Sequence, residues 1–265
     1  MNASLVALSM TAIVVTAAAV PARAADATYH HVHLTAPSPE EATQWYVTHM
    51  GCEPAPGRKD AARCGTVQLL FYRRAPKAGT EGTGMHHIGF SFLNLAQKMK
   101  ELEAAGVKIV RPMGEGRLKA AFVEDPWGTR IELVEDPESL GLYHVHLHTP
   151  DPAQTLTWYQ SAFGGQLLKR KLSGVEGLLY GTFWVLATKP AANELPLQPT
   201  DGRAVDHLGF SFANLDASVA ELKGKGVKFR EDVRTVKNAV GETLKIAFAM
   251  GPDDVTIELV QPPGR

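Results

Sequence analysis

The sequence predicts an α+β protein made of four copies of one unit, each a strand, a helix and about three further strands. Four segments open alike, with a short apolar or alternating run that is typical of a strand. Each run is followed by a turn and an amphipathic stretch. A pattern repeated along a chain indicates a duplicated architecture. The segments are HHVHLTAPSPEEATQWY (30–46), HHIGFSFLNLAQKMKELEAAGV (86–107), YHVHLHTPDPAQTLTWYQSAFGG (143–165) and DHLGFSFANLDASVAELKGKGV (206–227).

Helical spacing is clearest in the second and fourth units. Apolar residues recur there every three or four positions, and a glycine follows as a C-terminal stop. The series are Leu95, Met99, Leu102 with Gly106, and Leu215, Val219, Leu222 with Gly226. Strand-like runs complete each unit and end at TVQLLFYRR, TRIELVE, GTFWVLATK and VTIELVQ.

The four units are nested as two pairs. The first unit is most like the third, and the second is most like the fourth, which indicates that a two-unit domain was itself duplicated. The connector DPESLGL (136–142) carries a proline and a glycine of the kind found between domains. We therefore expect one domain over residues 25–140 and a second over 141–265.

The N-terminus predicts export. Residues 5–20 are apolar, and Ala22-Arg23-Ala24 is a small-x-small cleavage signal. A secretory signal peptide over residues 1–24 would leave an exported protein, periplasmic in a bacterium or secreted. The n-region has no Lys or Arg, and the alternative is an uncleaved N-terminal anchor.

Composition narrows the class of protein. The chain has 265 residues, is 45% hydrophobic and has a formal net charge of -1, so no basic field indicates a nucleic acid or an anionic membrane as partner. In an oxidising compartment, Cys52 and Cys64 could form a disulfide across the turn-rich segment between them. Two separate buried thiols are the alternative.

The repeated pattern resembles the vicinal oxygen chelate superfamily of glyoxalases, extradiol dioxygenases, epimerases and bleomycin-resistance proteins. The resemblance rests on His31-Val32, on His87-Ile88 with GFSF, and on DPWGTRIEL (125–133). In the second half it rests on His144-Val145, on His207-Leu208 with GFSF, and on Ile257-Glu258-Leu259. It covers nearly all of the mature chain and implies two tandem domains, in which paired units form a concave, metal-binding cup.

Strand parity is consistent with the metal ligands that this resemblance implies. Side chains on a strand alternate between faces, so the apolar residues of each strand share one face and leave a histidine or glutamate on the other. The implied triads are His31, His87 and Glu132 in the first half, and His144, His207 and Glu258 in the second. Solvated side chains on an open sheet face are the alternative.

Two imidazoles and a carboxylate leave coordination positions open. Such a triad suits Fe(II) that binds substrate and oxygen together, and it also accepts Zn(II), Ni(II) or Mn(II). Fe(II) and dioxygenase-like chemistry are favoured, because glyoxalases and epimerases normally have a fourth protein ligand, and the last strand of the first unit has no carboxylate. Gln68 on that strand is the one candidate for a fourth ligand.

Further histidines share the ligand face. His33 in the first half and His146 in the second are candidate acid/base residues, metal-ligand partners or pocket walls. By the same parity, His30 and His86 point away from the site.

The expected function is a metal-dependent enzyme that chelates two adjacent oxygens of a small molecule. The alternatives are a glyoxalase- or epimerase-type lyase or isomerase, and a non-catalytic binding protein on the same fold. The expected partner is a small-molecule substrate, with no nucleic acid and no membrane after signal cleavage. The protein would act as a monomer or homodimer, and each half would close its own cup or exchange units with a partner chain.

Overall fold

A computed structural model describes residues 27–115, 118–194 and 196–264, so the predicted signal peptide lies outside the described residues. Within that part of the chain, no helix is both long and apolar enough to cross a membrane. The first half contains β1 (Thr28–Ala36), α1 (Pro39–Met50), β2 (Glu53–Pro54), β3 (Ala61–Cys64), β4 (Val67–Arg73), β5 (Met85–Phe92), α2 (Leu95–Ala104), β6 (Lys108–Arg111), β7 (Ala120–Glu124) and β8 (Arg130–Glu135).

The second half repeats this order with two short additions. It contains β9 (Gly141–His148), α3 (Pro152–Phe163), β10 (Gln166–Lys169), β11 (Glu176–Tyr180), β12 (Phe183–Thr188), the 3₁₀ turn η2 (Ala192–Glu194), β13 (Val205–Ser211), α4 (Leu215–Gly224), β14 (Lys228–Lys237), β15 (Thr243–Met250), the 3₁₀ turn η3 (Pro252–Asp254) and β16 (Thr256–Gln261). The predicted succession of strand, helix and three strands is therefore confirmed in all four units.

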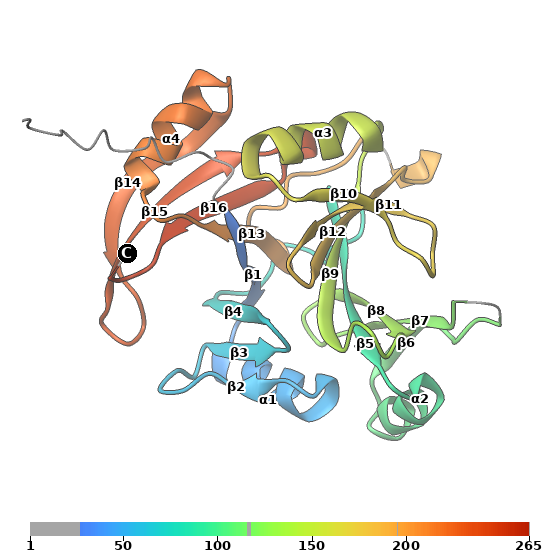
Figure 1. Ribbon diagram of the computed structural model, residues 1–265. Helices are drawn as coiled ribbons and strands as arrows, with labels where there is room; N and C mark the ends of the chain where they lie inside the picture. Colours follow the sequence, from blue (N-terminus) through green and yellow to red (C-terminus); the bar gives the residue numbers. More distant parts are fainter. Residues whose placement is uncertain (1–26, 116–117, 195, 265) are drawn as a thin grey trace, which may run out of the picture.

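The strands form two eight-stranded sheets, and each sheet joins one unit from each half of the chain. The first sheet has the order β14-β15-β16-β13-β1-β4-β3-β2, and the second has β10-β11-β12-β9-β5-β8-β7-β6. The first unit thus pairs with the fourth through β1 and β13, while the second pairs with the third through β5 and β9. Figure 1 shows the blue β1 beside the orange β13, and β5 beside β9.

The lengths of the connections explain this pairing. Only residues 136–140 link β8 to β9, and so short a link keeps both strands in one sheet, two strand spacings apart across β5. Residues 74–84 link β4 to β5, and residues 189–204 link β12 to β13. These longer links carry the chain from one sheet to the other. The predicted boundary at 140/141 therefore does not separate two sheets.

Helix ends follow the expected chemistry. In α1, the Ser38 side chain accepts a hydrogen bond from the Glu41 backbone N–H, and Gly51 ends the helix in the left-handed conformation with φ 72°. The predicted stops Gly106 and Gly226 also have positive φ, at 72° and 84°, directly after the capping residues of α2 and α4.

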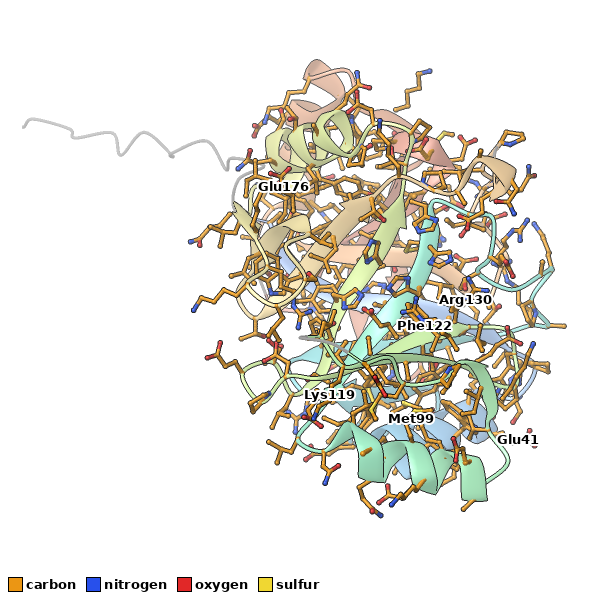
Figure 2. The ribbon with its side chains drawn as sticks, turned by 90° about the vertical axis from the view of Figure 1, so that its right-hand side faces the viewer. Glu41, Met99, Lys119, Phe122, Arg130 and Glu176 are labelled. Atoms are coloured by element: carbon orange, nitrogen blue, oxygen red, sulfur yellow. A yellow bond between two sulfur atoms is a disulfide. The ribbon has the colours of Figure 1, made fainter. Side chains whose placement is uncertain are left out.

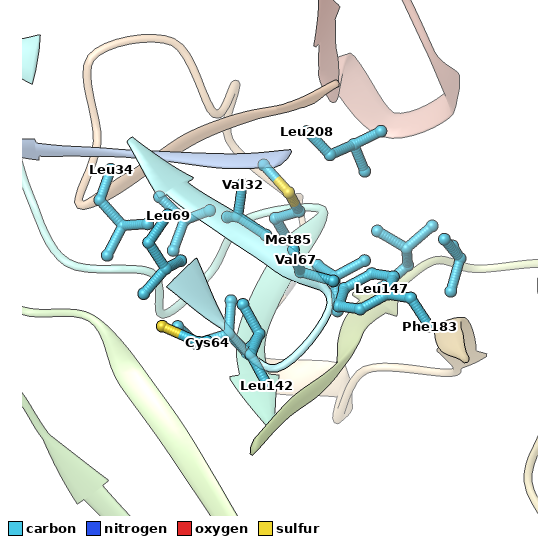
Figure 3. Close-up of a cluster of buried hydrophobic side chains, with 14 of the residues drawn as sticks. Val32, Leu34, Cys64, Val67, Leu69, Met85, Leu142, Leu147, Phe183 and Leu208 are labelled. Carbon is cyan, nitrogen blue, oxygen red and sulfur yellow. The ribbon is translucent and has the colours of Figure 1, made fainter. Parts of the chain in front are cut away.

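One hydrophobic core runs through both sheets. Figure 3 shows part of it, in which Val32 and Leu208 of the first sheet lie near Met85 and Leu147 of the second. Helix α1 reaches both sheets, because the Tyr46 ring lies 5.6 Å from the Phe71 ring and 6.2 Å from the Phe90 ring between centroids. Helix α3 does the same from the other half, where the Phe163 ring stacks on the Phe210 ring at 4.4 Å.

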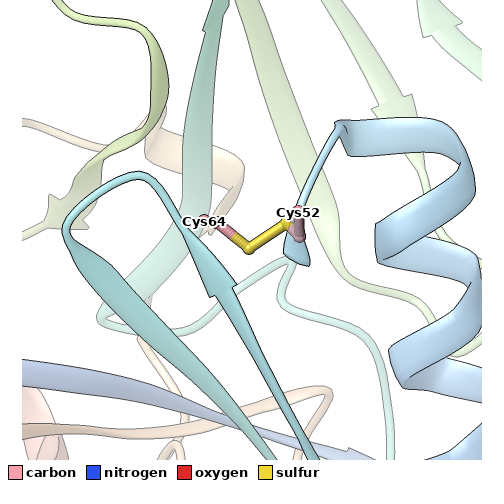
Figure 4. Close-up of a disulfide and its surroundings, with 2 residues drawn as sticks. All are labelled: Cys52 and Cys64. Atoms are coloured by element: carbon pink, nitrogen blue, oxygen red, sulfur yellow. A yellow bond between two sulfur atoms is a disulfide. The ribbon is translucent and has the colours of Figure 1, made fainter. Parts of the chain in front are cut away.

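Of the two alternatives for the cysteines, a disulfide or separate buried thiols, the structure shows the disulfide. Cys52 and Cys64, 12 positions apart, are bonded and tie the segment after α1 to the end of β3 (Figure 4). Both half-cystines are buried at the edge of the core.

Removing this disulfide is expected to destabilise the fold. A closed loop of this size reduces the entropy of the unfolded chain enough to contribute about 3 kcal/mol. The Cys52→Ala, Cys64→Ala double variant should therefore unfold at lower urea concentration than the oxidised parent, with a slope that is equal or steeper because the unfolded chain is less compact without the disulfide. The reduced parent is the control and should resemble the variant. Identical unfolding midpoints in all three samples would contradict a stabilising role.

Candidate metal centres

The first cup is the face of the first sheet that carries His31 of β1, His207 of β13 and Glu258 of β16. One carboxylate oxygen, Glu258 Oε2, lies 3.0 Å from His31 Nε2 and 3.0 Å from His207 Nε2. All three side chains are buried, with the two histidines 0% exposed and Glu258 6% exposed. Together with His33, they form a cluster whose donor atoms lie within 4.8 Å of one another. Two imidazoles and a carboxylate therefore converge on one point.

The nitrogen of His31 at that point has no hydrogen-bond partner among the described residues. His31 Nε2 is close to Glu258 but is not aligned to hydrogen-bond with it. A buried polar atom normally has a partner, and an orphaned one needs an explanation. Neutral imidazole nitrogen and carboxylate oxygen are ordinary ligands of divalent metals. The donor set of the first cup therefore fits a divalent metal ion.

The charges of the first cup are strongly coupled. Burial raises the pKa of Glu258, but the hydrogen bond from His207 and the nearby His31 outweigh it and hold this pKa well below its usual range. Burial lowers the pKa of His207, yet hydrogen bonds to Asp206 and Glu258 raise it to about 9. For His31, burial is the largest effect and lowers the pKa. At neutral pH the cup thus holds an ionised Glu258 carboxylate between a neutral His31 imidazole and a protonated His207 imidazole, and a metal ion that binds there would displace the His207 proton.

A glycine makes room for the His31 ring. Gly209 of the GFSF motif is the cross-strand partner of His31, and a Cβ atom at this position would lie 2.1 Å from His31 Cε1 and 2.7 Å from Nε2. In the second sheet, Gly89 stands in the same relation to His144, where a Cβ atom would lie 1.9 Å from Cε1. These glycines let each imidazole lie across the neighbouring strand.

Four candidate ligands are histidines: His31, His207, His87 and His144. The residue before each of them is skipped in the strand pairing. At His30 and Asp206 in the first sheet, and at His86 and Tyr143 in the second, the register shifts by one residue, as in a β-bulge. A bulge redirects side chains, so strict alternation fails there. His30 Nδ1 lies 2.8 Å from His31 Nδ1, and His86 Nδ1 lies 2.8 Å from His87 Nδ1. The prediction that His30 and His86 point away from the site is therefore wrong.

These preceding residues fix the orientation of the histidines. Asp206 Oδ1 accepts from His207 Nδ1 at 2.6 Å, and Asp206 Oδ2 accepts from the Gly202 N–H at 2.5 Å and from Arg74. An imidazole whose Nδ1 is held in this way presents Nε2 to the cup. His144 differs, because it follows Tyr143 and its Nδ1 has no partner among the described residues.

Asp206→Asn is expected to weaken divalent metal binding at the first cup by about 10- to 100-fold, because the amide cannot hold and polarise His207 as the carboxylate does. Titration with Zn(II) against a chromogenic chelator measures this. Asp201→Asn is the matched control: Asp201 lies in the loop before β13 and contacts Lys77, Arg230 and, at 3.8 Å, Arg74, but not His207. Equal affinities of both variants and the parent would contradict this role.

A cavity of about 710 Å³ opens over the first cup. His33 lies in its wall, with its ring stacked on Tyr72 at 3.7 Å and 4.7 Å from the His207 ring. Burial lowers the pKa of His33 well below its usual range, and its Nδ1 has no partner among the described residues, so this imidazole is neutral. Gln68 on β4 also lines the cavity and is the cross-strand partner of His31.

The second cup is the corresponding face of the second sheet, with His87, His144 and Glu132. Glu132 Oε2 lies 3.6 Å from His87 Nε2 and 3.5 Å from His144 Nε2, and neither nitrogen has a hydrogen-bond partner among the described residues. His146, the other candidate acid/base residue, clusters with the two histidines, and its Nε2 lies 2.9 Å from Thr188 Oγ1. Phe122, labelled in Figure 2, meets the His87 ring edge-on at 5.1 Å.

Three features weaken the second cup as a metal centre. Trp184 is the cross-strand partner of His144 and takes the position that Gln68 has beside His31. Burial raises the pKa of Glu132, whereas that of Glu258 is lowered. Tyr143 replaces the hydrogen-bonding residue that precedes the other three histidines. We therefore expect tighter metal binding at the first cup.

The six predicted ligand residues do come together, but in a different grouping. His31 meets His207 and Glu258 rather than His87 and Glu132, so the triads that were expected within each half are wrong. The physical reason is the sheet topology, which pairs the first unit with the fourth and the second with the third.

A third histidine cluster lies beside the second cup. His86 stacks on His148 at 3.9 Å, and His148 Nδ1 lies 2.7 Å from Glu194 Oε2. His86 Nε2 accepts from Arg130 Nη1 at 2.8 Å. Because His86 Nε2 already accepts a hydrogen bond from Arg130, we assign this cluster a structural role. Its contact with His87 is through His86 Nδ1, which helps to hold the His87 ring in place.

Comparisons with known proteins agree with this fold. The family model described as Glyoxalase/Bleomycin resistance protein/Dioxygenase superfamily matches residues 28–133 and 141–259. A probable chloroplastic lactoylglutathione lyase of Arabidopsis thaliana is 33% identical over 94 residues, which are 34% of this chain and 27% of that protein. Glyoxalase I of Saccharomyces cerevisiae is 28% identical over 165 residues, which are 49% of this chain and 48% of that protein. The matches thus span less than half of these relatives.

Solved structures share the fold. Glyoxalase I of Zea mays superposes with a TM-score of 0.68 at 19% identity, over 89% of this chain and 92% of that one. A protein described as a dioxygenase of Bacillus subtilis superposes with a TM-score of 0.61 at 14% identity, over 89% and 85% of the two chains. At these identities, the likeness concerns the fold alone.

Proposed function

Because the chain belongs to the glyoxalase/bleomycin resistance protein/dioxygenase superfamily, we propose that it is a metal-dependent enzyme whose active centre is the first cup. The observation that carries the proposal is the convergence of His31, His207 and Glu258 on one buried point at the floor of a cavity, with an orphaned imidazole nitrogen. A divalent metal held there would bind two adjacent oxygens of a small substrate and stabilise the anion formed when a proton leaves.

The residues around this point have separable tasks. His33 lies in the cavity wall next to His207, so its position allows it to exchange a proton with a substrate in the cavity. Tyr72 stacks on the His33 ring and fixes its plane. The buried surroundings of Glu258 and His207 keep bulk water away from the charges, which strengthens each electrostatic interaction.

Lyase or isomerase chemistry is favoured over oxygenase chemistry. The preference for a dioxygenase rested on a missing fourth ligand, but Gln68 lines the same cavity as the triad and faces His31 across the strands. Two imidazoles, a carboxylate and an amide oxygen make four donors. This set is compatible with Zn(II), Ni(II), Mn(II) or Fe(II), and it leaves Fe(II) with no special advantage.

Export remains part of the proposal. The Cys52–Cys64 disulfide supports it, because disulfides persist in oxidising compartments and are rare in the cytosol. A periplasmic or secreted enzyme would meet substrates outside the reducing interior of the cell.

Proton exchange separates the candidate activities. Hydroxyacetone has a carbonyl and a hydroxyl oxygen on adjacent carbons, so it serves as a minimal chelating probe. Protein loaded with Zn(II), Ni(II), Mn(II) or anaerobically with Fe(II) should speed exchange of its carbon-bound protons in D₂O, as measured by NMR. Glu258→Gln should abolish the effect. Oxygen uptake without exchange, measured with catechol and the Fe(II) form, would instead favour the dioxygenase. Metal binding with neither activity would favour a non-catalytic binding protein.

A further inference from the structure

The walls of the cavity over the first cup are mainly apolar. They come from three segments: the loop closed by the disulfide, the β14–β15 hairpin, and the end of β16 with the residues after it. Its volume of about 710 Å³ is that of a typical small-molecule site. The apolar residues from these segments are Ala55, Pro56, Val236, Ala239, Val240, Leu244, Ile246, Val260, Pro262 and Pro263.

The hairpin wall is a hydrophobic cluster separate from the main core. Ile246, Phe248 and Val260 pack together, with Val236 and Leu244 against them. They lie on the cup side of the sheet, away from the helices that bury the main core. Apolar side chains gathered at the mouth of a polar centre favour an apolar ligand, which they would remove from water.

The charged residues of these walls already have partners. Arg58 donates to both oxygens of Asp60, at 3.0 Å each, and Arg63 donates to Glu53 at 2.8 Å. A ligand carboxylate entering the cavity would meet Asp60, Glu242 and Glu258, whereas the described lining arginines, Arg58 and Arg63, are already paired with carboxylates. Placing such a charge against apolar walls is costly.

We infer that the first cup takes a small compound with two adjacent oxygens on a predominantly apolar, uncharged body, and disfavours compounds with carboxylate arms. This inference rests on the proposed function, because the adjacent oxygens are assigned to the metal. Leu244 and Val240 on the hairpin are then specificity-determining residues, since they line the cavity away from the donors.

Three hydroxamates test the inference, since they share one chelating head and differ in the tail. Acetohydroxamate has almost no tail, octanohydroxamate has an apolar tail, and suberic acid monohydroxamate has a tail of the same length ending in a carboxylate. Their affinities are measured by calorimetry on protein holding one equivalent of Zn(II). Octanohydroxamate should bind roughly 10- to 100-fold more tightly than acetohydroxamate. Suberic acid monohydroxamate should bind at least about tenfold more weakly than octanohydroxamate, because its carboxylate must be placed against apolar walls.

Wall variants locate the effect. Leu244→Ser and Val240→Ser should each weaken octanohydroxamate binding about three- to tenfold and leave acetohydroxamate binding unchanged. The exposed position of Val240, at 45%, makes its variant safe for folding. Leu118→Ser is the matched control, because Leu118 packs against the corresponding small cluster of the second sheet. It should change neither affinity.

The outcomes separate the two proposals. If Zn(II) and acetohydroxamate bind but the apolar tail gives no gain, or the carboxylated tail binds best, the apolar-substrate inference is overturned and the metal centre stands. If Zn(II) does not bind at all, the proposed function fails, and the inference that rests on it fails too.

Discussion

Glu258→Gln is expected to weaken divalent metal binding at the first cup by more than about 100-fold and to abolish turnover. Loss of a residue that only supports a ligand costs about 10- to 100-fold, and loss of the charged ligand itself should cost more. Glu258 also lies 3.0 Å from both His31 and His207, so it organises the whole triad. Competition between the protein and a chromogenic chelator for Zn(II) measures the change.

Glu132→Gln is the matched control for this variant. It makes the same substitution at the same strand position of the second cup, 3.6 Å from His87 and 3.5 Å from His144. It should leave the tighter of the two metal affinities unchanged. If tight metal binding is retained in Glu258→Gln but lost in Glu132→Gln, the principal metal centre is in the second cup.

Gly209→Ala is expected to displace the His31 ring and remove most of the tight metal binding. The added Cβ atom would lie 2.1 to 2.7 Å from three ring atoms, so the imidazole must move. Overpacking of this kind also costs about 1–3 kcal/mol of stability. Urea unfolding and Zn(II) titration measure the two effects.

A double-variant cycle shows whether the clash with His31 is the cause. In a His31→Ala background, the ring is absent, so Gly209→Ala should cost little additional stability. Gly89→Ala, which crowds His144 in the second sheet, should destabilise the protein similarly but spare the tight ion. Additive losses in the cycle would assign the cost of Gly209→Ala to the backbone instead.

Away from the bulges, alternation along the strands was sufficient to predict which face a residue occupies. Val32 and Ile88 are fully buried on the core side, while His31 and His87 lie on the cup side. This worked because a strand has a side-chain period of two and the helices cover only one face of each sheet.

Alternation failed only at the bulges, where the sequence carried a signal that periodicity ignores. Parity assigns positions 30, 86, 143 and 206 to the apolar face, yet they hold His, His, Tyr and Asp. No aliphatic residue occurs at any of the four. Polar side chains at all four positions are better explained by a bulge, which at positions 30, 86 and 206 turns them into hydrogen-bonding contact with the neighbouring imidazole.

The grouping of the ligands depended on strand pairing, which local pattern cannot determine. The sequence pattern within one unit is the same whether that unit pairs with the next unit or with the unit at the far end of the chain. The available signal was the length of the connections, since the link of residues 136–140 is much shorter than the links 74–84 and 189–204 that change sheets. The duplication instead suggested that each half forms its own cup. The ligand triads were therefore assigned within each half, which is wrong.

The most direct test of the account compares the tight metal ion in three single variants, His31→Ala, His207→Ala and His87→Ala. Equilibrium dialysis with Zn(II) at limiting concentration counts the ions bound tightly per chain. If the first cup is the metal centre, His31→Ala and His207→Ala should both lose the tightly bound ion, although the two residues come from opposite halves of the chain. His87→Ala should retain it. Loss of the ion in His31→Ala and His87→Ala with retention in His207→Ala would contradict the account.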